Sequence, residues 1–467
     1  MRLNHNTLAY TANNNLNTIN NNLTKSMERL SSGYKINKSS DDPAGKAISQ
    51  KMRAQLRGLE RATDNAGDGI SLIQTAEGAL EEVHSILARM RELAVRAANE
   101  TYDESDKDAM MDEISQLQEE IDRIAETTDF NGRNLLNGEL NKKGYTNTDD
   151  LSIVEIGGDI EPDVYGLTIT GTGTQASTSI TAMTAGTTIT AAQAGTLSIN
   201  GFDITISEGM TADEVNEAIR DAAAKIEIDY DSSTGELVTK QYGSKQSITV
   251  TASNDDLAAL FGADGTTVYG TNAEVEISTD AAGKRVGFSS TATVETQGNR
   301  ITITDKDGFK MVYDVAPDSV NSTTGATQAE ITVLSAGPMV FQIGSDEGQT
   351  LNVNISKTTV EALEIDHINL YTGEYATKAI EQLDKAIDKI SGIRSSLGAY
   401  QNRLEHTVTN LETANENLTS AVSRIADTDM AEEITEYTEL NVLSQSALQM
   451  LIKSNARPEG LLQLFQR

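Results

Sequence analysis

The segment IEQLDKAIDKISGIRSSLGAYQNRLEHTVTNLETANENLTSAVSRIA, residues 380–426, decides the fold of this chain. Its large apolar residues recur every seven positions without a break. They are Leu383, Ile390, Leu397, Leu404, Leu411, Leu418 and Ile425. A heptad repeat is typical of a helix that packs lengthwise against other helices. Because no proline interrupts the segment, we expect one helix of about 75 Å whose apolar stripe is the core of a helical rod.

The N-terminal 140 residues have the same rhythm. In the first helix, small and apolar residues follow at steps of three and four, among them Leu16, Ile19, Leu23 and Leu30. The seams of both terminal helices are rich in Ala, Asn and Ser, which suits close helix packing better than a monomer core. We therefore predict that these four residues pack between subunits, together with Ile434, Leu448 and Leu451 at the other end of the chain.

Two breaks divide the N-terminal region. In SSDDPAG, Asp42 is suited to cap a helix and Pro43 to begin it. Ser105 and Asp108 have the spacing of a capping box, which predicts the start of a third helix. We expect that helix to stop at the turn Asn131-Gly132, where the apolar rhythm ends.

The middle of the chain has the period of β-strands. Apolar residues alternate in LSINGFDITIS (197–207) and in ITITDKDGFKMVYDV (301–315), the latter around an Asp307-Gly308 turn. Thr211 and Glu214 are spaced as a capping box, which predicts a helix over 212–226 and thus a ββα unit. This part is acidic and rich in threonine, so we expect it to face solvent.

These patterns indicate an α+β protein, in which both chain ends form a long antiparallel coiled-coil-like helical rod that carries an inserted β-rich outer domain. A final helix is expected over about 431–452. The predicted domains are a core helix (1–42), an inner rod domain (43–140), the outer domain (141–338), a second inner rod domain (339–430) and a C-terminal core helix (431–467).

Composition excludes several classes of function. The 467 residues include 37 basic and 70 acidic side chains, a net charge of −33, which argues against nucleic-acid or anionic-membrane binding. The chain has no cysteine, so it forms no disulfide and no thiolate site. No stretch approaches the 18 or so apolar residues of a membrane span, and the N-terminal residues lack the apolar region of a signal peptide.

Catalytic motifs are missing as well. A zinc peptidase would need HExxH, but the four histidines, at positions 5, 84, 367 and 406, are far apart in sequence. There is no G-x-S-x-G elbow or phosphate-binding glycine loop, and Asp255-Asp256 lies in no calcium-loop spacing. We predict that the protein is not an enzyme and has no metal and no cofactor.

Several long motifs resemble bacterial flagellins. They are LSSGYKINKSSDDPAGKAIS (30–49), TTDFNGRNLLNG (127–138), FQIGSDEGQTLNVNI (341–355), LGAYQNRLEHTVTNLETANENLTSAVSRIADTDMAEE (397–433) and LNVLSQSALQMLIKSNARPEGLLQLFQR (440–467). The resemblance implies a structural subunit that polymerises into the flagellar filament and supports swimming. One feature departs from the family: the 341–355 hairpin directly precedes the C-terminal helices, so the insertion enters before it.

The resemblance also implies partners and a location. The chain would be exported unfolded by the type III export apparatus with an export chaperone, without a cleaved signal peptide. It would assemble at the tip of the extracellular flagellum as a homo-oligomer, next to the filament cap and hook-associated proteins. Two alternatives stay open: a hook–filament junction protein, and an adhesin or carbohydrate-binding surface protein.

The resemblance implies a host-receptor surface too. In flagellins recognised by the vertebrate Toll-like flagellin receptor, an arginine matching Arg89 is a central contact, and other contact positions match Leu87, Leu93 and Glu113. By their pattern alone, the charged residues around Arg89 read as a solvated helix face. Leu87 lies on the apolar seam, which favours burial.

Overall fold

The computed structural model describes residues 6–99, 101–157, 160–183, 186–279, 285–305, 309–317, 327–334 and 337–465. The chain forms two compact units. The first comprises Met1–Asp68, Gln342–Thr350 and Leu404–Arg467, and the second Gly69–Phe341 and Leu351–Arg403. The boundaries fall inside two long helices, α2 (Pro43–Ala97) and α7 (Gly373–Ala426). The five domains expected from the sequence stay a prediction.

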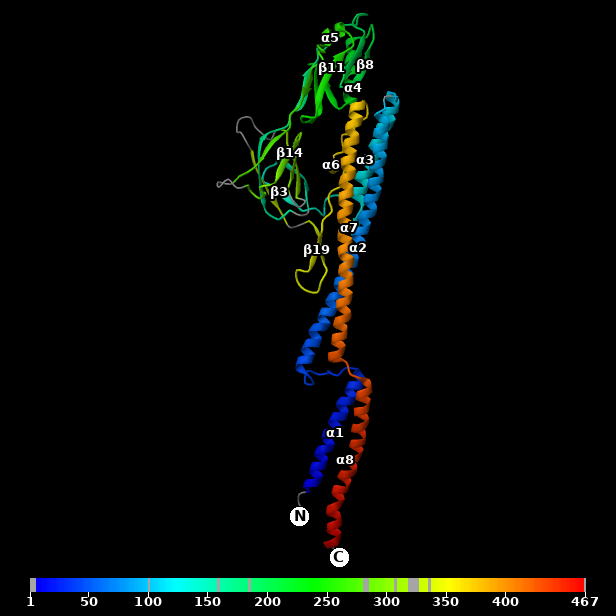
Figure 1. Ribbon diagram of the computed structural model, residues 1–467, viewed down its shortest axis with the longest axis vertical. Coiled ribbons are helices and arrows are strands. Elements are labelled where there is room, and N and C mark those ends of the chain that lie inside the picture. The colour runs from blue at the N-terminus through cyan, green and yellow to red at the C-terminus, as the bar shows by residue number, and fades with distance from the viewer. Residues whose placement is uncertain are drawn as a thin grey trace. The chain divides into compact units, whose positions relative to one another are not determined.

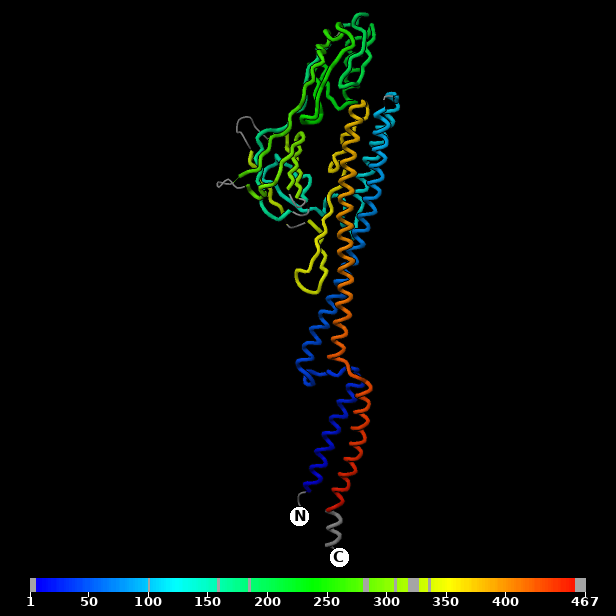
Figure 2. Tube along the Cα trace, viewed as in Figure 1, coloured from blue at the N-terminus to red at the C-terminus, as the bar shows by residue number. Residues whose placement is uncertain are grey.

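In the first unit, α1 (Thr7–Ser32) and α8 (Met430–Phe465) lie side by side (Figures 1 and 2). α8 extends well beyond the expected end near residue 452. The turns that precede α2 and α8 are tied by backbone hydrogen bonds. The amide of Lys35 donates to the carbonyl of Ala426 at 2.8 Å, and the amide of Thr428 donates to that of Gly33 at 3.0 Å. α2 and α8 therefore start from two turns that are hydrogen-bonded to each other, and we call this pair of turns the joint.

In the second unit, parts of α2 and α7 pack with α3 (Glu104–Thr127) into a helical bundle (Figure 1). Its core is aliphatic, and Leu80, Ile114, Ile121, Leu383 and Ile390 are fully buried. Ion pairs between helices flank this core, since Arg91 lies 2.5 Å from Asp384 and Arg394 lies 2.8 Å from Glu77.

Helix ends test the capping predictions. Asp42 accepts a hydrogen bond from the amide of Gly45 at 3.0 Å and α2 begins at Pro43, which confirms that prediction. The predicted Ser105/Asp108 box is wrong. Asp103 caps α3 instead, accepting from the amide of Asp106 at 2.9 Å. Asp103 is an equally good cap, and starting there puts Glu104 and Asp106 in the first turn, where the helix dipole favours them.

The turn Asn131-Gly132 does not end α3, which already stops at Thr127. It joins the two short strands β1 (Asp129–Phe130) and β2 (Arg133–Asn134). Asn131 and Gly132 have φ values of 54° and 77°, the left-handed backbone that a two-residue hairpin turn requires. The Asn-Gly signal was therefore a hairpin signal and not a helix stop.

The described residues of the insertion form two separate β cores. The first is a sandwich of two antiparallel four-stranded sheets, ordered β13-β5-β17-β3 and β14-β15-β16-β4. The strands are β3 (Gly144–Thr146), β4 (Leu151–Ile156), β5 (Val164–Gly171), β13 (Glu274–Ile277), β14 (Thr293–Gln297), β15 (Arg300–Thr304), β16 (Lys310–Val315) and β17 (Thr327–Val333). Ile303 pairs with Met311 and Ile301 with Tyr313, so β15 and β16 pair with their alternating apolar residues opposite one another. The expected Asp307-Gly308 turn lies outside the described residues.

The second core is the ββα subdomain. Its sheets are ordered β6-β10-β9 and β12-β11-β7-β8. They comprise β6 (Gln175–Ser179), β7 (Gly195–Ile199), β8 (Phe202–Ile206), β9 (Ile228–Asp231), β10 (Glu236–Tyr242), β11 (Ser247–Ala252) and β12 (Thr267–Tyr269), with α4 (Ala212–Lys225) and α5 (Asp255–Phe261). The Thr211/Glu214 capping box of α4 is present, which confirms the predicted ββα unit. Tyr371 and Tyr375 pack against this core.

The chain enters and leaves the insertion at adjacent points. The amide of Leu334 donates to the carbonyl of Lys143 at 2.8 Å, and β17 pairs with β3. A hairpin of β18 (Met339–Gln342) and β19 (Thr350–Val353) follows, then the short helix α6 (Val360–Leu363), which leads to α7. The predicted α+β class, with long helices from both chain ends and a β-rich middle, is confirmed.

Candidate functional site

The α1–α8 pair is held by a seam of small and medium-sized side chains. Its apolar residues are half-buried: Ala9, Ala12, Leu16, Ile19, Leu23 and Leu30 on α1, and Leu440, Ala447 and Leu451 on α8. Only polar residues of the two helices, Ser26 and Glu433, are buried among the described side chains. Ser444 donates a hydrogen bond to the side-chain oxygen of Asn20 at 3.0 Å. Arg29 lies 3.6 Å from the buried carboxylate of Glu433. The seam thus brings the helices together without sealing them from water.

Outside this seam, α8 also exposes several large apolar side chains among its polar ones. Val442, Leu448 and Met450 have 59%, 48% and 66% of their surface accessible. Among the described side chains of α8, the exposed large apolar ones are Met430, Ile434, Val442, Leu443, Leu448, Met450 and Ile452. At 3.6 residues per turn they lie on three sides of the helix, and the α1-facing stripe takes the fourth. Large apolar side chains exposed in this number on one helix mark an interaction surface, so this outward face of α8 lacks a cover.

The seven terminal residues selected from the sequence divide into two groups. Leu16, Ile19, Leu23, Leu30 and Leu451 are half-buried, and they line the contact between α1 and α8 of the same chain. Ile434 and Leu448 are exposed on the outward face. Sequence reasoning missed most of that face. The signal that could have found it is the run Leu440–Ile452, which contains no charged residue in a chain of net charge −33.

The heptad residues of α7 are buried for most of its length. Leu383, Ile390, Leu397 and Leu404 have no accessible surface, and Leu411 retains 8%. Leu418 and Ile425, at the end of α7, are half-buried. In the first part of α7 the other buried positions belong to alanines, Ala376, Ala379 and Ala386, which allow close helix approach.

The four residues that match the receptor surface are divided as well. Leu87 and Leu93 are buried in the bundle, so their side chains cannot touch a partner in this conformation. Arg89 and Glu113 lie at the surface of α2 and α3, with the Arg89 Nε 2.8 Å from a Glu113 carboxylate oxygen. Hydrogen bonds to Glu113 and then Glu92 raise the pKa of Arg89 above its usual value. Of the four matching residues, the structure brings only Arg89 and Glu113 into contact at the surface.

In the described part of the chain, the acidic and histidine side chains that metal binding or catalysis would need are dispersed. Within the described residues, no three His, Asp or Glu side chains come together as a metal site. A groove in the first unit is lined by Glu60, Thr63, Asp64, Glu412, Asn415 and Glu416, which offer no nucleophile paired with a base. None of the described helices has the length and apolarity to cross a membrane.

Comparisons with known proteins agree with the helical architecture. The family described as "Bacterial flagellin N-terminal helical region" matches residues 3–141, and "Bacterial flagellin C-terminal helical region" matches residues 380–465. A flagellin of Clostridium tyrobutyricum is 36% identical over 462 residues, covering 98% of this chain and 100% of that protein. Flagellin B of Vibrio cholerae is 32% identical over 466 residues, covering 100% of this chain and 99% of that protein.

Solved structures give weaker likenesses. The flagellar hook associated protein-3 of Legionella pneumophila has a TM-score of 0.31 and 14% identity, covering 80% of this chain and 98% of that one. FliC from Burkholderia pseudomallei has a TM-score of 0.24 and 18% identity, covering 72% of this chain and 99% of that one. Scores this low support no argument about function.

Proposed function

Because the chain belongs to the bacterial flagellin family, it is a structural subunit of the flagellar filament, and we propose that it polymerises through the outward face of α8. The filament is extracellular and serves swimming, and the family is structural, not enzymatic. Its full-length relatives are flagellins at 36% and 32% identity, so a junction protein or an adhesin is not favoured.

The observation that supports this proposal is the uncharged segment Leu440–Ile452 of α8, which exposes Val442, Leu443, Leu448, Met450 and Ile452. Fully burying one leucine or isoleucine side chain contributes about 1.5–3 kcal/mol. Several such residues on three sides of one helix can bind more than one neighbour. The half-buried α1–α8 seam would then be completed in the filament, where neighbouring copies exclude the remaining water. Residues 1–42 and 431–467 would form the filament core, and 43–140 with 339–430 the surrounding rod.

Leu448→Gln tests the proposal. It exchanges an exposed apolar side chain for a polar one of similar size, so the monomer should be unaffected. Losing about 2 kcal/mol per subunit contact corresponds to a roughly 30-fold higher critical concentration for polymerisation. The control is Tyr269→Gln on β12, which also replaces an exposed apolar residue but lies in the ββα subdomain. Equal critical concentrations for both variants would refute the proposal.

We also infer the export partners and neighbours of the family: an export chaperone, the type III export apparatus, the filament cap and the hook-associated proteins. A chain without cysteine can pass through a narrow channel unfolded, because no disulfide has to be broken. Cross-linking a stalled chain to the export apparatus in cells would test this. A filament that assembles normally after loss of that apparatus would contradict it.

For the vertebrate receptor, we propose a contact limited to the Arg89–Glu113 edge. Both side chains are half-exposed and already aligned by their 2.8 Å hydrogen bond. Arg89→Ala should weaken receptor binding by about 2 kcal/mol, the cost of an interface arginine. Arg91→Ala is the matched control, because Arg91 lies two residues away and pairs with Asp384 instead. Equal losses of binding in both variants would contradict a contact at Arg89.

A further inference from the structure

The β-sandwich meets the helices through charged side chains and not through its core. Its apolar core is made of residues from Leu151 to Val333, and the partly buried apolar residues packed on it also belong to the sandwich. Among the described residues, no apolar side chain of α2, α3 or α7 joins that core. The ββα subdomain differs, since Tyr371 and Tyr375, near the start of α7, pack against its core. Polar contacts therefore have a larger part in holding the sandwich.

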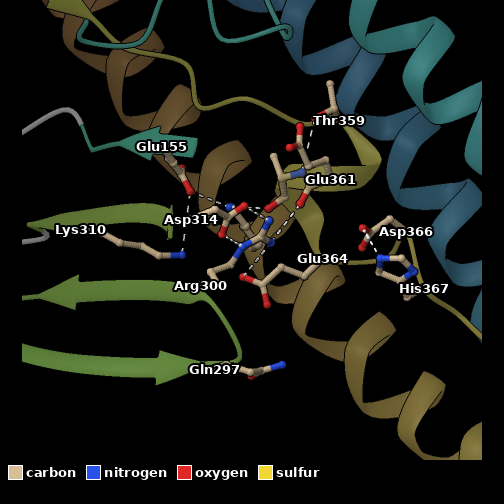
Figure 3. Close-up of polar contacts among 12 residues, drawn as sticks. Glu155, Gln297, Arg300, Lys310, Asp314, Thr359, Glu361, Glu364, Asp366 and His367 are labelled. Atoms are coloured by element: carbon tan, nitrogen blue, oxygen red, sulfur yellow. Dashed lines mark hydrogen bonds and ion pairs between the residues drawn. The ribbon is translucent and has the colours of Figure 1, made fainter. Parts of the chain in front are cut away.

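Figure 3 shows where these polar contacts gather. Glu155, the next-to-last residue of β4, is only 6% exposed. A carboxylate removed from water to that extent is unfavourable unless a cation and hydrogen-bond donors compensate it. The cation that pairs with Glu155 therefore helps to hold the sandwich in its position against the helices.

Lys389 of α7 is that partner. Its Nζ lies 2.7 Å from Glu155 Oε2 and 2.9 Å from the carbonyl oxygen of Ala362 in α6. The other cation nearby, Lys310 of the sandwich itself, is 3.9 Å from the same oxygen. Burial, followed by the charge of Lys389, lowers the pKa of Lys310. Lys389 is the closer cation, and it alone of the two comes from the helices.

Arg300 makes a second contact between the sandwich and α6, but its main partner lies inside the sandwich. It makes a two-pronged pair with Asp314 of the neighbouring strand, at 2.8 and 3.0 Å. A third nitrogen lies 3.3 Å from the carbonyl oxygen of Glu361 and 3.9 Å from the Glu364 carboxylate. Because its strongest partner is inside the sandwich, removing Arg300 would disturb the sandwich as well as its attachment.

We propose that Lys389 is a positioning residue that docks the β-sandwich on α7 and fixes the direction in which the filament subunit presents that sandwich. One lysine reaches a buried sandwich carboxylate and the end of α6 at once, and so joins three elements. The charge pair is specific because a slipped sandwich would leave Glu155 with only Lys310, 3.9 Å away, and without the 2.7 Å hydrogen bond from Lys389. Polymerisation through α8 does not depend on this contact.

The absence of cysteine allows a direct distance measurement. Spin labels can be attached at Thr293→Cys in β14 and Ser395→Cys in α7, which are both exposed positions. Pulsed electron paramagnetic resonance then measures the distance between the two labels, and so the position of the sandwich relative to α7. Lys389→Met should at least double the width of the distance distribution. The matched control is Lys385→Met, one turn earlier on α7, whose ion pair with Glu381 stays within the helix. The control should keep the parental distribution.

Rescue separates a lost charge pair from a general packing defect. Lys389→Met combined with Glu155→Gln removes both charges and should narrow the distribution again, and Lys389→Arg should keep it narrow. Should Lys389→Met fail to fold by circular dichroism, Glu155→Gln alone breaks the pair from the other side and should broaden the distribution. The critical concentration for polymerisation should stay within twofold of the parent. A parental width in Lys389→Met, or equal broadening in Lys385→Met, would overturn the proposal.

Discussion

Two helical seams in this molecule share one sequence rhythm but differ in burial. In the bundle of α2, α3 and α7, Leu80, Leu383 and Ile390 are fully buried. In the α1–α8 pair, Leu16, Ile19 and Leu23 are only half-buried, and α8 exposes apolar residues on its other sides. Apolar residues spaced three and four apart therefore indicate that two helices pack together. The size of these side chains and the polarity of the other helix faces indicate whether a single chain can bury them fully.

The largest expected difference is in monomer stability. Leu80→Ala should lower the free energy of unfolding by about 3 kcal/mol, because it leaves a cavity in a fully enclosed core. Leu448→Ala should change it by less than about 0.5 kcal/mol, as for most surface substitutions. Urea denaturation of the monomer followed by circular dichroism measures both. Similar losses in the two variants would remove the distinction between the seams.

Amide exchange should show the second-largest effect. In the monomer we expect amides of α1 and α8 to exchange at least about a hundredfold faster than those in the middle of α7, because few buried contacts oppose local opening. In the filament this difference should largely vanish. Mass spectrometry on peptides from residues 7–32 and 430–457 provides the measurement. Strong protection of both ends in the monomer would show that the α1–α8 seam is sufficient by itself.

Removing the insertion isolates the two seams from the β cores. Deletion of residues 145–335, closed by a short Gly/Ser linker, is feasible because Lys143 and Leu334 are hydrogen-bonded neighbours. The chain should still polymerise. The bundle should lose about 1–2 kcal/mol, since Tyr371 and Tyr375 lose their apolar contacts with the ββα subdomain. Electron microscopy and thermal unfolding would test this, and a helical, secreted chain that forms no filaments would contradict it.

The smallest effect is a pH dependence confined to the second unit. His367 lies 3.1 Å from Asp366 and 3.3 Å from Glu227, and hydrogen bonds to these two carboxylates raise the pKa of His367 to about 10. Because the folded pKa is raised, this contribution is complete below about pH 6.5 and is lost as pH rises towards 10. The side chain is 46% exposed, so solvent screening limits the effect to about 1 kcal/mol.

Thermal unfolding between pH 6 and pH 10.5 measures that contribution. His367→Gln should flatten the profile of the second unit over this range, because the amide does not titrate. The α1–α8 pair contains no comparable group among its described contacts, so its amide exchange, corrected for the intrinsic pH dependence, should be the same in the variant. An unchanged thermal profile in His367→Gln would show that the imidazolium contributes nothing to folding.

Local and periodic features could be predicted from the sequence. The heptad core of α7, the Asp42 cap, the Thr211/Glu214 box and the alternation of apolar residues along β15 and β16 each depend on residues close together in the chain. Choices between equally suitable local signals were less certain, as the cap at Asp103 in place of Ser105 illustrates.

Contacts between residues far apart in the chain could not be predicted, because they leave no pattern in the sequence. Lys389 and Glu155 are 234 residues apart, and nothing near either residue marks the other. The division of the insertion into two cores also depends on which strands pair, and alternation alone does not specify a partner. Burial of Leu87 and Leu93 was within reach, however, because Leu87 lies on the seam.

The joint between the turns that precede α2 and α8 has a kinetic consequence. Lys35 with Ala426, and Thr428 with Gly33, fasten the base of α1 to the base of α8. Each helix is thereby held at an effective concentration on the order of millimolar with respect to the other, as in any short tether. A growing filament end that captures α8 of an incoming subunit does not need a second diffusional encounter to recruit α1. Addition of a subunit can then proceed as one bimolecular event followed by fast intramolecular closure.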